Sequence, residues 1–399
     1  MQLFKKIFNW LFRASAPKAN TNKVSLDTNL LFAAILLLSC GLIMVFSASI
    51  AYAAKDSGSG NEYYYLFRHI LAITLGVVAG VLAFNLPTAF WQRNANKIIV
   101  GVIILLIAVL IPHVGRLVNG SRRWLPLGLL NLQPSELAKL GIAIYMANYF
   151  CGKSLCLSKF KSDILPILTT LLTVCVLLLV EPDMGSTTVV FIIALTILYL
   201  SDLDVRVILG ALAFGAVAFV LLIVFEPYRI KRVVGFLDPW LDALGKGYQL
   251  SHSLLAFGHG GWFGVGLGNS LEKLYYLPEA HTDFILAIIG EEFGVIGVVT
   301  VLILFWIIFY RGFTLIAGDT KRLAKRKFQG LLAQGISVWF FAQAVVNIGV
   351  SIGMLPTKGL TLPFVSFGGS SILVNCIALA ILLKIDYENK LLKYGAPLD

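Results

Sequence analysis

The chain has 399 residues, of which 58% are hydrophobic and only 13% are charged, and its formal net charge at pH 7 is +11. Soluble domains carry about 25% charged residues, and a mean hydropathy of +0.85 implies more apolar surface than a water-soluble core can enclose. These values exclude a soluble globular protein and predict an integral membrane protein with one shared helical core. The five cysteines have no zinc-ligand spacing, and none lies between residues 226 and 283, which argues against a disulfide framework.

Residues 1–28 are predicted to form a cytoplasmic N-terminal segment that is amphipathic and basic. Apolar residues recur there at helical spacing, with Lys5, Lys6 and Arg13 between them. Such a helix lies on a membrane surface and does not cross it. The pattern is not that of a cleavable signal peptide.

Ten apolar stretches approach or exceed the length that crosses a membrane, which is about 20 residues. We therefore predict an all-α integral membrane protein with about ten transmembrane helices in one domain, 29–385, followed by a cytoplasmic C-terminal tail, 386–399. The expected spans are 29–50, 66–86, 96–112, 134–151, 164–181, 185–201, 205–226, 284–310, 328–353 and 367–385.

Most of the 32 basic residues fall on one side of these spans when the N-terminus is placed inside. This bias predicts that both termini are cytoplasmic and that the large loop 227–283, between the seventh and eighth spans, is extracytoplasmic. Some cations nevertheless lie on the outer side, where they either reach lipid headgroups or bind an anionic, phosphorylated substrate. These are Arg116, Arg122, Arg123, Arg229, Lys231, Arg232, Lys273 and Lys358.

Two further groups of charged residues lie within or beside predicted spans. Glu136 and Lys139 are three residues apart in the fourth span, so they share one helical face and can pair. Charged residues in a span are candidates for function, and a structural ion pair is the alternative. Glu181 and Asp183 flank a proline at a span boundary, where Asp183 either caps a helix or joins a carboxylate face of an outer cavity.

The long polar interval that begins at Glu226 ends with His281 and Asp283 at the mouth of the eighth span. A carboxylate at such a boundary is partly desolvated, which makes it more basic. Asp283 is therefore the candidate for the chemical step, and His281 is expected to be a hydrogen-bonding neighbour. Glu291 and Glu292, about two helical turns deeper, are expected to serve packing or gating.

Two glycine-rich stretches are predicted to be irregular. The glycines between residues 258 and 268 spell no nucleotide-binding fingerprint, and they indicate re-entrant or tightly packed backbone. The stretch 354–371 contains two prolines, three glycines, hydroxyl groups that include Ser370, and Lys358. Its amides, hydroxyls and lysine could cradle a phosphate group.

Seven segments together resemble the SEDS family (shape, elongation, division and sporulation proteins). The resemblance runs from the third span to the tenth. The residues of the motifs are more similar to those of the division members of the family than to those of the elongation members. One departure is Phe367, where the family commonly has tyrosine. The matching segments are SRRW, QPSELAKL, EPDMG, EPYRIKRV, GYQLSHSLLAFGHGGWFGVGLGNS, LPEAHTDFILAIIGEEFG and MLPTKGLTLPFVSFGGSS.

The resemblance implies a peptidoglycan glycosyltransferase that polymerises lipid II, an undecaprenyl-pyrophosphate-linked disaccharide-pentapeptide, at the outer face of the cytoplasmic (inner) membrane. It also implies a location at the division septum, with a class B penicillin-binding transpeptidase and other division-complex membrane proteins as partners. No nucleic-acid partner is expected. The family's essential aspartate falls on Asp283, and its other charged positions fall on Arg123, Glu136, Lys139, Glu226 and Lys358.

The residues fit this chemistry. Asp283 can take the proton of an acceptor sugar hydroxyl as its oxygen attacks the donor anomeric carbon, a single displacement that inverts that centre. The leaving lipid pyrophosphate needs cations, either basic side chains or a divalent ion such as Mg2+ or Mn2+, and no other cofactor is expected. The predicted substrate-binding residues are Arg122, Arg123, Glu136, Lys139, Glu226, Arg229, Lys358 and Ser370.

Three alternatives remain open at the level of the sequence. A lipid II flippase would place its charges near the bilayer midplane, accessible in turn from both sides, whereas the candidate charges here lie at the outer face. The same polymerase activity could serve cell elongation instead of division. A structural scaffold would recruit division proteins and would not need the outer charges.

Overall fold

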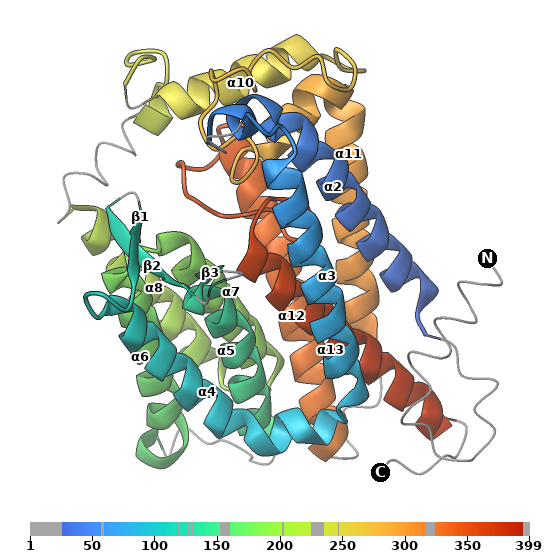
Figure 1. Ribbon diagram of the computed structural model, residues 1–399. Coiled ribbons are helices and arrows are strands. Elements are labelled where there is room, and N and C mark those ends of the chain that lie inside the picture. Colours follow the sequence, from blue (N-terminus) through green and yellow to red (C-terminus); the bar gives the residue numbers. More distant parts are fainter. Residues whose placement is uncertain are drawn as a thin grey trace.

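Figure 1 shows the computed structural model of the chain, a bundle of long helices with a small β-sheet on one side. The structure describes residues 26–56, 60–118, 120–126, 128, 131–151, 160–201, 203–224, 235–245, 247–315 and 324–393. Most of the predicted N-terminal segment, the end of the predicted tail, and the candidate site residues Glu226 and Arg229 lie outside these ranges.

Each predicted span corresponds to a long helix. Seven helices of the described chain are long and apolar enough to cross a membrane, namely α2, α3, α4, α6 with the turn before it, α11, α12 and α13, and α7 and α8 are shorter apolar helices. The chain is therefore a helical, multi-pass membrane protein. The ten helices are α2 (Thr28–Asp56), α3 (Tyr64–Asn85), α4 (Thr88–Leu110), α5 (Pro134–Cys151), α6 (Leu165–Val180), α7 (Met184–Leu200), α8 (Val205–Val224), α11 (Ile285–Thr314), α12 (Ala324–Ser351) and α13 (Gly369–Lys393).

Several helices extend beyond their predicted ends, and α4 and α13 do so by the most residues. α4 begins at Thr88, well before the predicted residue 96, and α13 continues past 385 into the segment predicted as tail. These polar ends are helical because they bind each other. Glu388 accepts hydrogen bonds from the backbone nitrogen of Thr88 at 2.9 Å and from its Oγ1 at 2.6 Å, and Gln329 Nε2 donates to Glu388 Oε2 at 2.7 Å.

A small antiparallel sheet, absent from the all-α expectation, joins α4 to α5. It consists of β1 (Arg116–Val118), β2 (Ser121–Pro126) and β3 (Asn131–Leu132), in that spatial order. The strands are too short for hydrophobic alternation to reveal them. Gly120, with a φ of 78°, supplies the left-handed backbone of the turn between β1 and β2. A single π-helical turn, Phe160–Ile164, precedes α6.

The helices form two groups that lie side by side in Figure 1, α4 to α8 with the sheet in one and α2, α3, α11 and α13 in the other. α12 packs on both groups, since it contacts α11 as well as α5 and α7. Its Trp339 and Phe340 are fully buried in the shared apolar core. Close approach elsewhere depends on small residues: a Cβ on Gly76 of α3 would lie 3.1 Å from the Sγ atom of Cys376 on α13.

The large loop between α8 and α11 contains a further helix, α10 (Tyr248–Gly260), which its glycines did not predict. α10 lies across one end of the bundle, at the top of Figure 1. The turn after it packs backbone on backbone, because a Cβ on Gly264 would lie 2.2 Å from the backbone oxygen of Glu292. α11 is interrupted beside this contact, where Gly294 has a φ of 67°. The sequence left re-entrant and tightly packed backbone as alternatives for these glycines, and the structure shows tightly packed backbone.

Candidate active site

Asp283 lies in the turn that immediately precedes α11, and its side chain is half-buried. This turn is held from α12, because Asn347 Nδ2 donates to the backbone oxygen of Asp283 at 2.8 Å and to that of Leu360 at 2.6 Å. One amide therefore joins the Asp283 turn to the segment 354–368, which we call the 354–368 loop. A Cβ on Gly359 would lie 2.9 Å from Asp283 Oδ2, so the carboxylate lies directly against this loop.

The 354–368 loop also contacts the start of α7. Lys358 Nζ donates to Thr188 Oγ1 at 3.3 Å, and a Cβ on Gly185 would lie 2.6 Å from Cγ of Leu360. The loop thus lies between α7, in one helix group, and the Asp283 turn, in the other. Its sequence alone was a weak signal for phosphate binding, yet it is the element around which the predicted site residues assemble.

Lys358 is half-buried, and burial lowers the pKa of its ammonium group from the ordinary value of 10.5. A surrounding of low polarity disfavours the charged form of a lysine. A bound anion would reverse this effect by favouring the ammonium form. Because the next residue, Gly359, lies against the carboxylate of Asp283, this carboxylate and a potential anion-binding group come close together.

Arg123 and Arg122 lie on β2 and are both half-buried. Arg123 donates from Nε to the backbone oxygen of Glu181 at 3.0 Å and from Nη2 to that of Pro182 at 2.6 Å. The guanidinium therefore ties the small sheet to the turn between α6 and α7. This places one of the predicted cations, Arg123, beside the turn that leads into α7, the helix that contacts Lys358.

The two carboxylates of that turn have different environments. Asp183 caps α7, since its side chain accepts hydrogen bonds from the backbone nitrogen of Ser186 at 3.0 Å and from its hydroxyl at 2.8 Å. The helix-cap interpretation is confirmed. Glu181 is completely buried, and neither of its carboxylate oxygens has a hydrogen-bond partner within the described parts of the chain. Burial chiefly, and the charge of Asp183 secondly, raise the pKa of Glu181 to about 8, and the nearby Arg123 opposes this shift.

Glu136 and Lys139 form the ion pair that their spacing predicted, with 2.7 Å between Lys139 Nζ and Glu136 Oε1. Both side chains are buried in α5, and Lys139 is 0% exposed. Lys139 Nζ also donates to Gln343 Oε1 at 2.9 Å, and Gln343 Nε2 donates to the backbone oxygen of Thr361 at 2.8 Å. The ion pair in α5 is therefore connected to the 354–368 loop through the side chain of Gln343.

Ser370 lies at the start of α13 and is buried. Its hydroxyl donates to the backbone oxygen of Asn131 at 2.5 Å and accepts from the backbone nitrogen of Gln133 at 3.0 Å. The serine joins α13 to the end of β3 and the start of α5. These bonds show a connection between elements, and direct substrate binding by Ser370 stays a prediction.

Glu291 and Glu292 hold the segment that follows α10. Glu291 accepts from the hydroxyl of Ser270 and from the backbone nitrogen of Leu271, the latter at 3.0 Å. Glu292 Oε1 lies 2.8 Å from Lys273 Nζ in a buried ion pair. Both glutamates thus serve packing, one of the two roles expected for them. Lys273 is buried in this contact, which removes it from the set of outer cations available to a substrate.

His281 packs among aromatic rings beside the Asp283 turn. Its ring centroid lies 4.6 Å from that of Tyr65 and 5.7 Å from that of Phe367. Its backbone oxygen accepts a hydrogen bond from the backbone nitrogen of Phe367 at 3.0 Å. The histidine thereby joins the Asp283 turn to the end of the 354–368 loop.

Within the described residues, no three His, Cys, Asp or Glu side chains are grouped so that they could hold a metal ion. Mg2+ is usually held by one or two carboxylates together with phosphate groups of the substrate, so a divalent ion beside Asp283 stays a prediction. The chemistry proposed below is written for the basic side chains of this chain.

Two residues central to this geometry, Asn347 and Gln343, were missed by the sequence predictions. They lie four residues apart on α12, in register with Trp339 and Ser351. Polar side chains at this spacing form one face of a helix. A polar stripe in an otherwise apolar span is the signal that could have revealed them.

The chain is similar in sequence to known cell cycle proteins. The family model described as "Cell cycle protein", which covers FtsW, RodA and SpoVE, matches residues 27–391. Two similar proteins are named probable peptidoglycan glycosyltransferase FtsW. The protein from Aromatoleum aromaticum is 51% identical over 371 residues, 93% of this chain and 90% of that protein. The protein from Nitrosomonas europaea is 48% identical over 381 residues, 96% of this chain and 98% of that protein.

Solved structures show the same relationship. A chain in a structure described as "Structural coordination of polymerization and crosslinking by a peptidoglycan synthase complex" is 30% identical, with a TM-score of 0.73 over 91% of this chain and 98% of that chain. The rod shape determining protein RodA of Thermus thermophilus is 28% identical, with a TM-score of 0.66 over 92% of this chain and 98% of that chain. The family predicted from the seven sequence segments is confirmed, and the chain belongs to the SEDS family of cell cycle proteins.

Proposed function

We propose that this membrane protein is a peptidoglycan glycosyltransferase that polymerises lipid II at the outer face of the cytoplasmic membrane during cell division. The relatives named peptidoglycan glycosyltransferase FtsW support this activity and favour division over elongation. The observation that carries the proposal is the contact between the carboxylate of Asp283 and Gly359, the residue next to Lys358. It brings a general base to a loop with a lysine suited to an anion.

In the proposed reaction, Asp283 accepts the proton of an acceptor sugar hydroxyl. The hydroxyl oxygen forms a bond to the anomeric carbon of the donor, and the bond from that carbon to the lipid pyrophosphate breaks. The negative charge that develops on the leaving pyrophosphate is stabilised by Lys358, with Arg122 and Arg123 on the other helix group. Arg229 is a further candidate, although it lies outside the described residues. The displacement inverts the anomeric centre.

Other residues of the site act through position in this proposal, including two that the sequence did not predict. Asn347 fixes the Asp283 turn relative to Leu360. Lys139 is fully buried, so the Glu136–Lys139 pair acts on the 354–368 loop through Gln343 and not by touching the substrate. Positioning matters because reacting groups must be held within a fraction of an ångström of productive geometry.

The proposed partner is a class B penicillin-binding transpeptidase. The related chain of known structure was described in the context of a peptidoglycan synthase complex that coordinates polymerisation and crosslinking. A polymerase whose product must be crosslinked benefits from such a complex, since nascent strands then reach the second enzyme without diffusion. Assembly at the division septum with other division-complex membrane proteins completes the proposal.

The test is an assay of glycan-chain formation with purified protein, its partner and lipid II. Asp283→Asn removes the base with little change in shape, and we expect the rate to fall by at least about 100-fold. Glu279→Gln is a matched control, because Glu279 is an exposed carboxylate in the preceding turn. An Asn variant that polymerises at the wild-type rate would show that Asp283 is not the base.

Two further outcomes would replace the proposal. If wild-type protein makes no glycan but moves lipid II across liposome membranes, the protein is a flippase. If it does neither, and charge-neutralising substitutions of Arg122, Arg123 and Lys358 all support growth, the protein is a scaffold. Each outcome is distinct from a failure of the base assignment, which leaves the wild-type polymerase active.

A further inference from the structure

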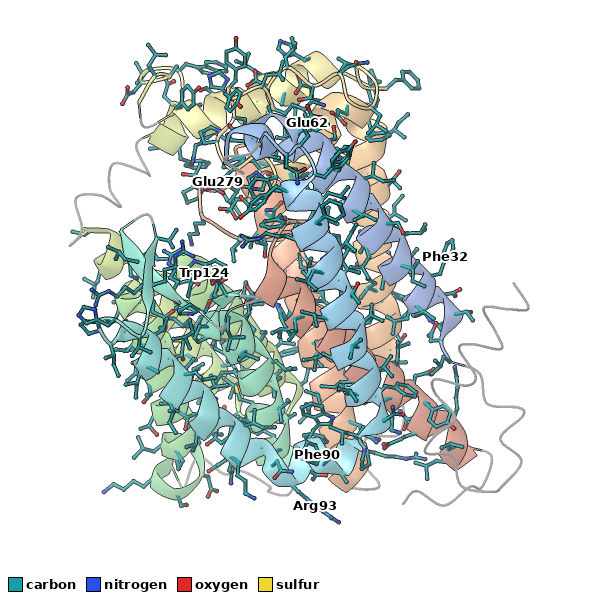
Figure 2. All side chains as sticks on the ribbon, in the orientation of Figure 1. Phe32, Glu62, Phe90, Arg93, Trp124 and Glu279 are labelled. Carbon is teal, nitrogen blue, oxygen red and sulfur yellow. The ribbon has the colours of Figure 1, made fainter. Side chains whose placement is uncertain are left out.

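A hollow in the molecule lies far from Asp283, between α4, α5 and α6. Its volume is ≈ 540 Å³, and it is lined in part by Asn96, Val100, Tyr145, Asn148 and Thr170. α5 begins beside the active site, at Pro134, and ends at Cys151, so Asn148 lies near its opposite end. Figure 2 shows the same polarity for α4, since Phe90 and Arg93 lie at the end of the molecule opposite Glu279.

Two asparagines, two tyrosines and a threonine line the hollow together with three apolar side chains. The first turns of α4 are polar, because they contain Gln92, Arg93, Asn94, Asn96 and Lys97, and the apolar part of the helix begins at Ile98. Asn96 therefore lies near the boundary between the hydrocarbon and the headgroup layer.

The two asparagines of the hollow are not satisfied by the protein. Asn96 is exposed and Asn148 is half-buried, and neither side-chain amide forms a hydrogen bond within the described residues. Thr170, by contrast, donates to the backbone oxygen of Pro166 at 2.9 Å. An amide at this boundary without a partner is unfavourable, so the hollow favours an occupant with hydrogen-bonding groups.

Charges of both signs lie around the hollow. Arg93 and Lys97 are exposed on α4 and Lys161 is exposed before α6, and Asp163, whose charge acts on Tyr149 of the lining, opposes these three cations. Arg93 lies three residues before Asn96, which places both on one helical face. Val100 follows four residues later on that face. The order along α4 is thus a cation at the membrane edge, an amide next to it, and apolar side chains deeper in the bilayer.

This order matches the parts of a glycerophospholipid from its phosphate to its acyl chains. We propose that the hollow binds the headgroup of an anionic phospholipid, in the leaflet opposite the active site. The phosphate contacts Arg93, the headgroup and glycerol oxygens accept hydrogen bonds from Asn96 and Asn148, and the acyl chains lie along Val100. The site is separate from the site of lipid II polymerisation and would hold its lipid whether or not the polymerase proposal is correct.

The experiment places a benzophenone amino acid at position 100 of the full-length protein. The protein is reconstituted in bilayers that contain equal amounts of phosphatidylglycerol and phosphatidylcholine, and the photoadducts are identified by mass spectrometry. We expect phosphatidylglycerol adducts to exceed phosphatidylcholine adducts by about tenfold, and the Asn96→Leu, Asn148→Leu double variant to lose about tenfold of the phosphatidylglycerol adduct. Arg93→Gln should abolish the preference for the anionic lipid and retain the adduct.

Matched controls separate a built site from ordinary contact with lipid. The same benzophenone at position 82, which is exposed near the end of α3 and does not line the hollow, should crosslink both lipids equally. Thr173→Leu removes an exposed hydroxyl from α6 outside the hollow and should leave adducts at position 100 unchanged. Equal yields of both lipids at position 100, or yields that the double variant does not change, would overturn the proposal. If the double variant is poorly folded, Asn96→Leu and Arg93→Gln alone decide the question, because both side chains are exposed.

Discussion

Gly359 leaves the space that the carboxylate of Asp283 occupies, since a Cβ at position 359 would lie 2.9 Å from Asp283 Oδ2. The atom in the way is the end of a side chain and not backbone, so an added methyl group would displace the carboxylate and leave the fold intact. The Asp283–Gly359 contact can therefore be tested separately from folding.

We expect Gly359→Ala to lower the rate of glycan polymerisation by about tenfold or more, because small displacements of a reacting group have large kinetic effects. Its thermal stability should equal that of the wild type. Gly368→Ala is the matched control in the same loop, since its Cβ would lie 3.4 Å from that of Ser371, an ordinary contact. Wild-type activity in Gly359→Ala would mean that the observed position of the carboxylate is not needed for the reaction.

The pH dependence of polymerisation should report on Lys358. Burial lowers the pKa of this lysine below 10.5, so its positive charge is lost at a lower pH than that of an exposed lysine. If the ammonium stabilises the leaving pyrophosphate, the rate falls as pH rises through that lowered pKa. Lys358→Arg keeps its charge throughout and should extend activity to higher pH. An unchanged alkaline limb in this variant would remove Lys358 from charge stabilisation.

The Glu136–Lys139 pair should behave as a buried structural unit. Removal of one partner leaves an uncompensated charge, and we expect Glu136→Gln and Lys139→Met each to lower stability by roughly 3–5 kcal/mol. The double variant should recover part of this loss, which a double-mutant cycle of thermal unfolding would measure. Lys97→Met is the control, because Lys97 is exposed on α4. Additive losses in the cycle would contradict the pairing.

Glu181 should make stability depend on pH. Burial raises its pKa from 4.5 to about 8 in the folded protein, so the folded state binds the proton more tightly than the unfolded state. Its contribution to stability is complete below the unfolded value and is lost as pH rises through the folded value. Between about pH 5 and pH 8.5, wild-type protein should therefore lose more thermal stability than Glu181→Gln, whose side chain stays neutral. Glu279→Gln, an exposed substitution, should follow the wild type.

The helices and the position of Asp283 just before α11 have local signals in the sequence, whereas the role of Asp283 as the base stays a prediction. Apolar stretches long enough to span a membrane located ten helices, and three-residue spacing predicted the Glu136–Lys139 pair. Asp283 was singled out by its position at the start of an apolar run. The ends of α4 and α13 were misplaced because their polar residues are helical only through contact with each other, and that contact joins positions 300 residues apart.

The surroundings of the base were not predictable in the same way. The side chain of Asn347 donates to the backbone oxygens of Asp283 and Leu360. Because every residue has a backbone oxygen, the sequence does not indicate which ones will be bonded. Glu181 and Asp183 flank one proline and look equivalent, yet the first is an unsatisfied buried carboxyl and the second a helix cap. Only the packing of α6 and α7 distinguishes them.

The 354–368 loop also has a consequence for how the protein is made. Asp283 leaves the ribosome before Asn347, Lys358 and α13, so a growing chain carries the proposed base well before the residues that hold it in place. Because the loop is fixed at its far end by Ser370 and the start of α13, the site is completed only when the last helix has entered the membrane. A prematurely terminated chain would therefore contain Asp283 without a working site, and incomplete synthesis yields an inert protein instead of an uncontrolled polymerase.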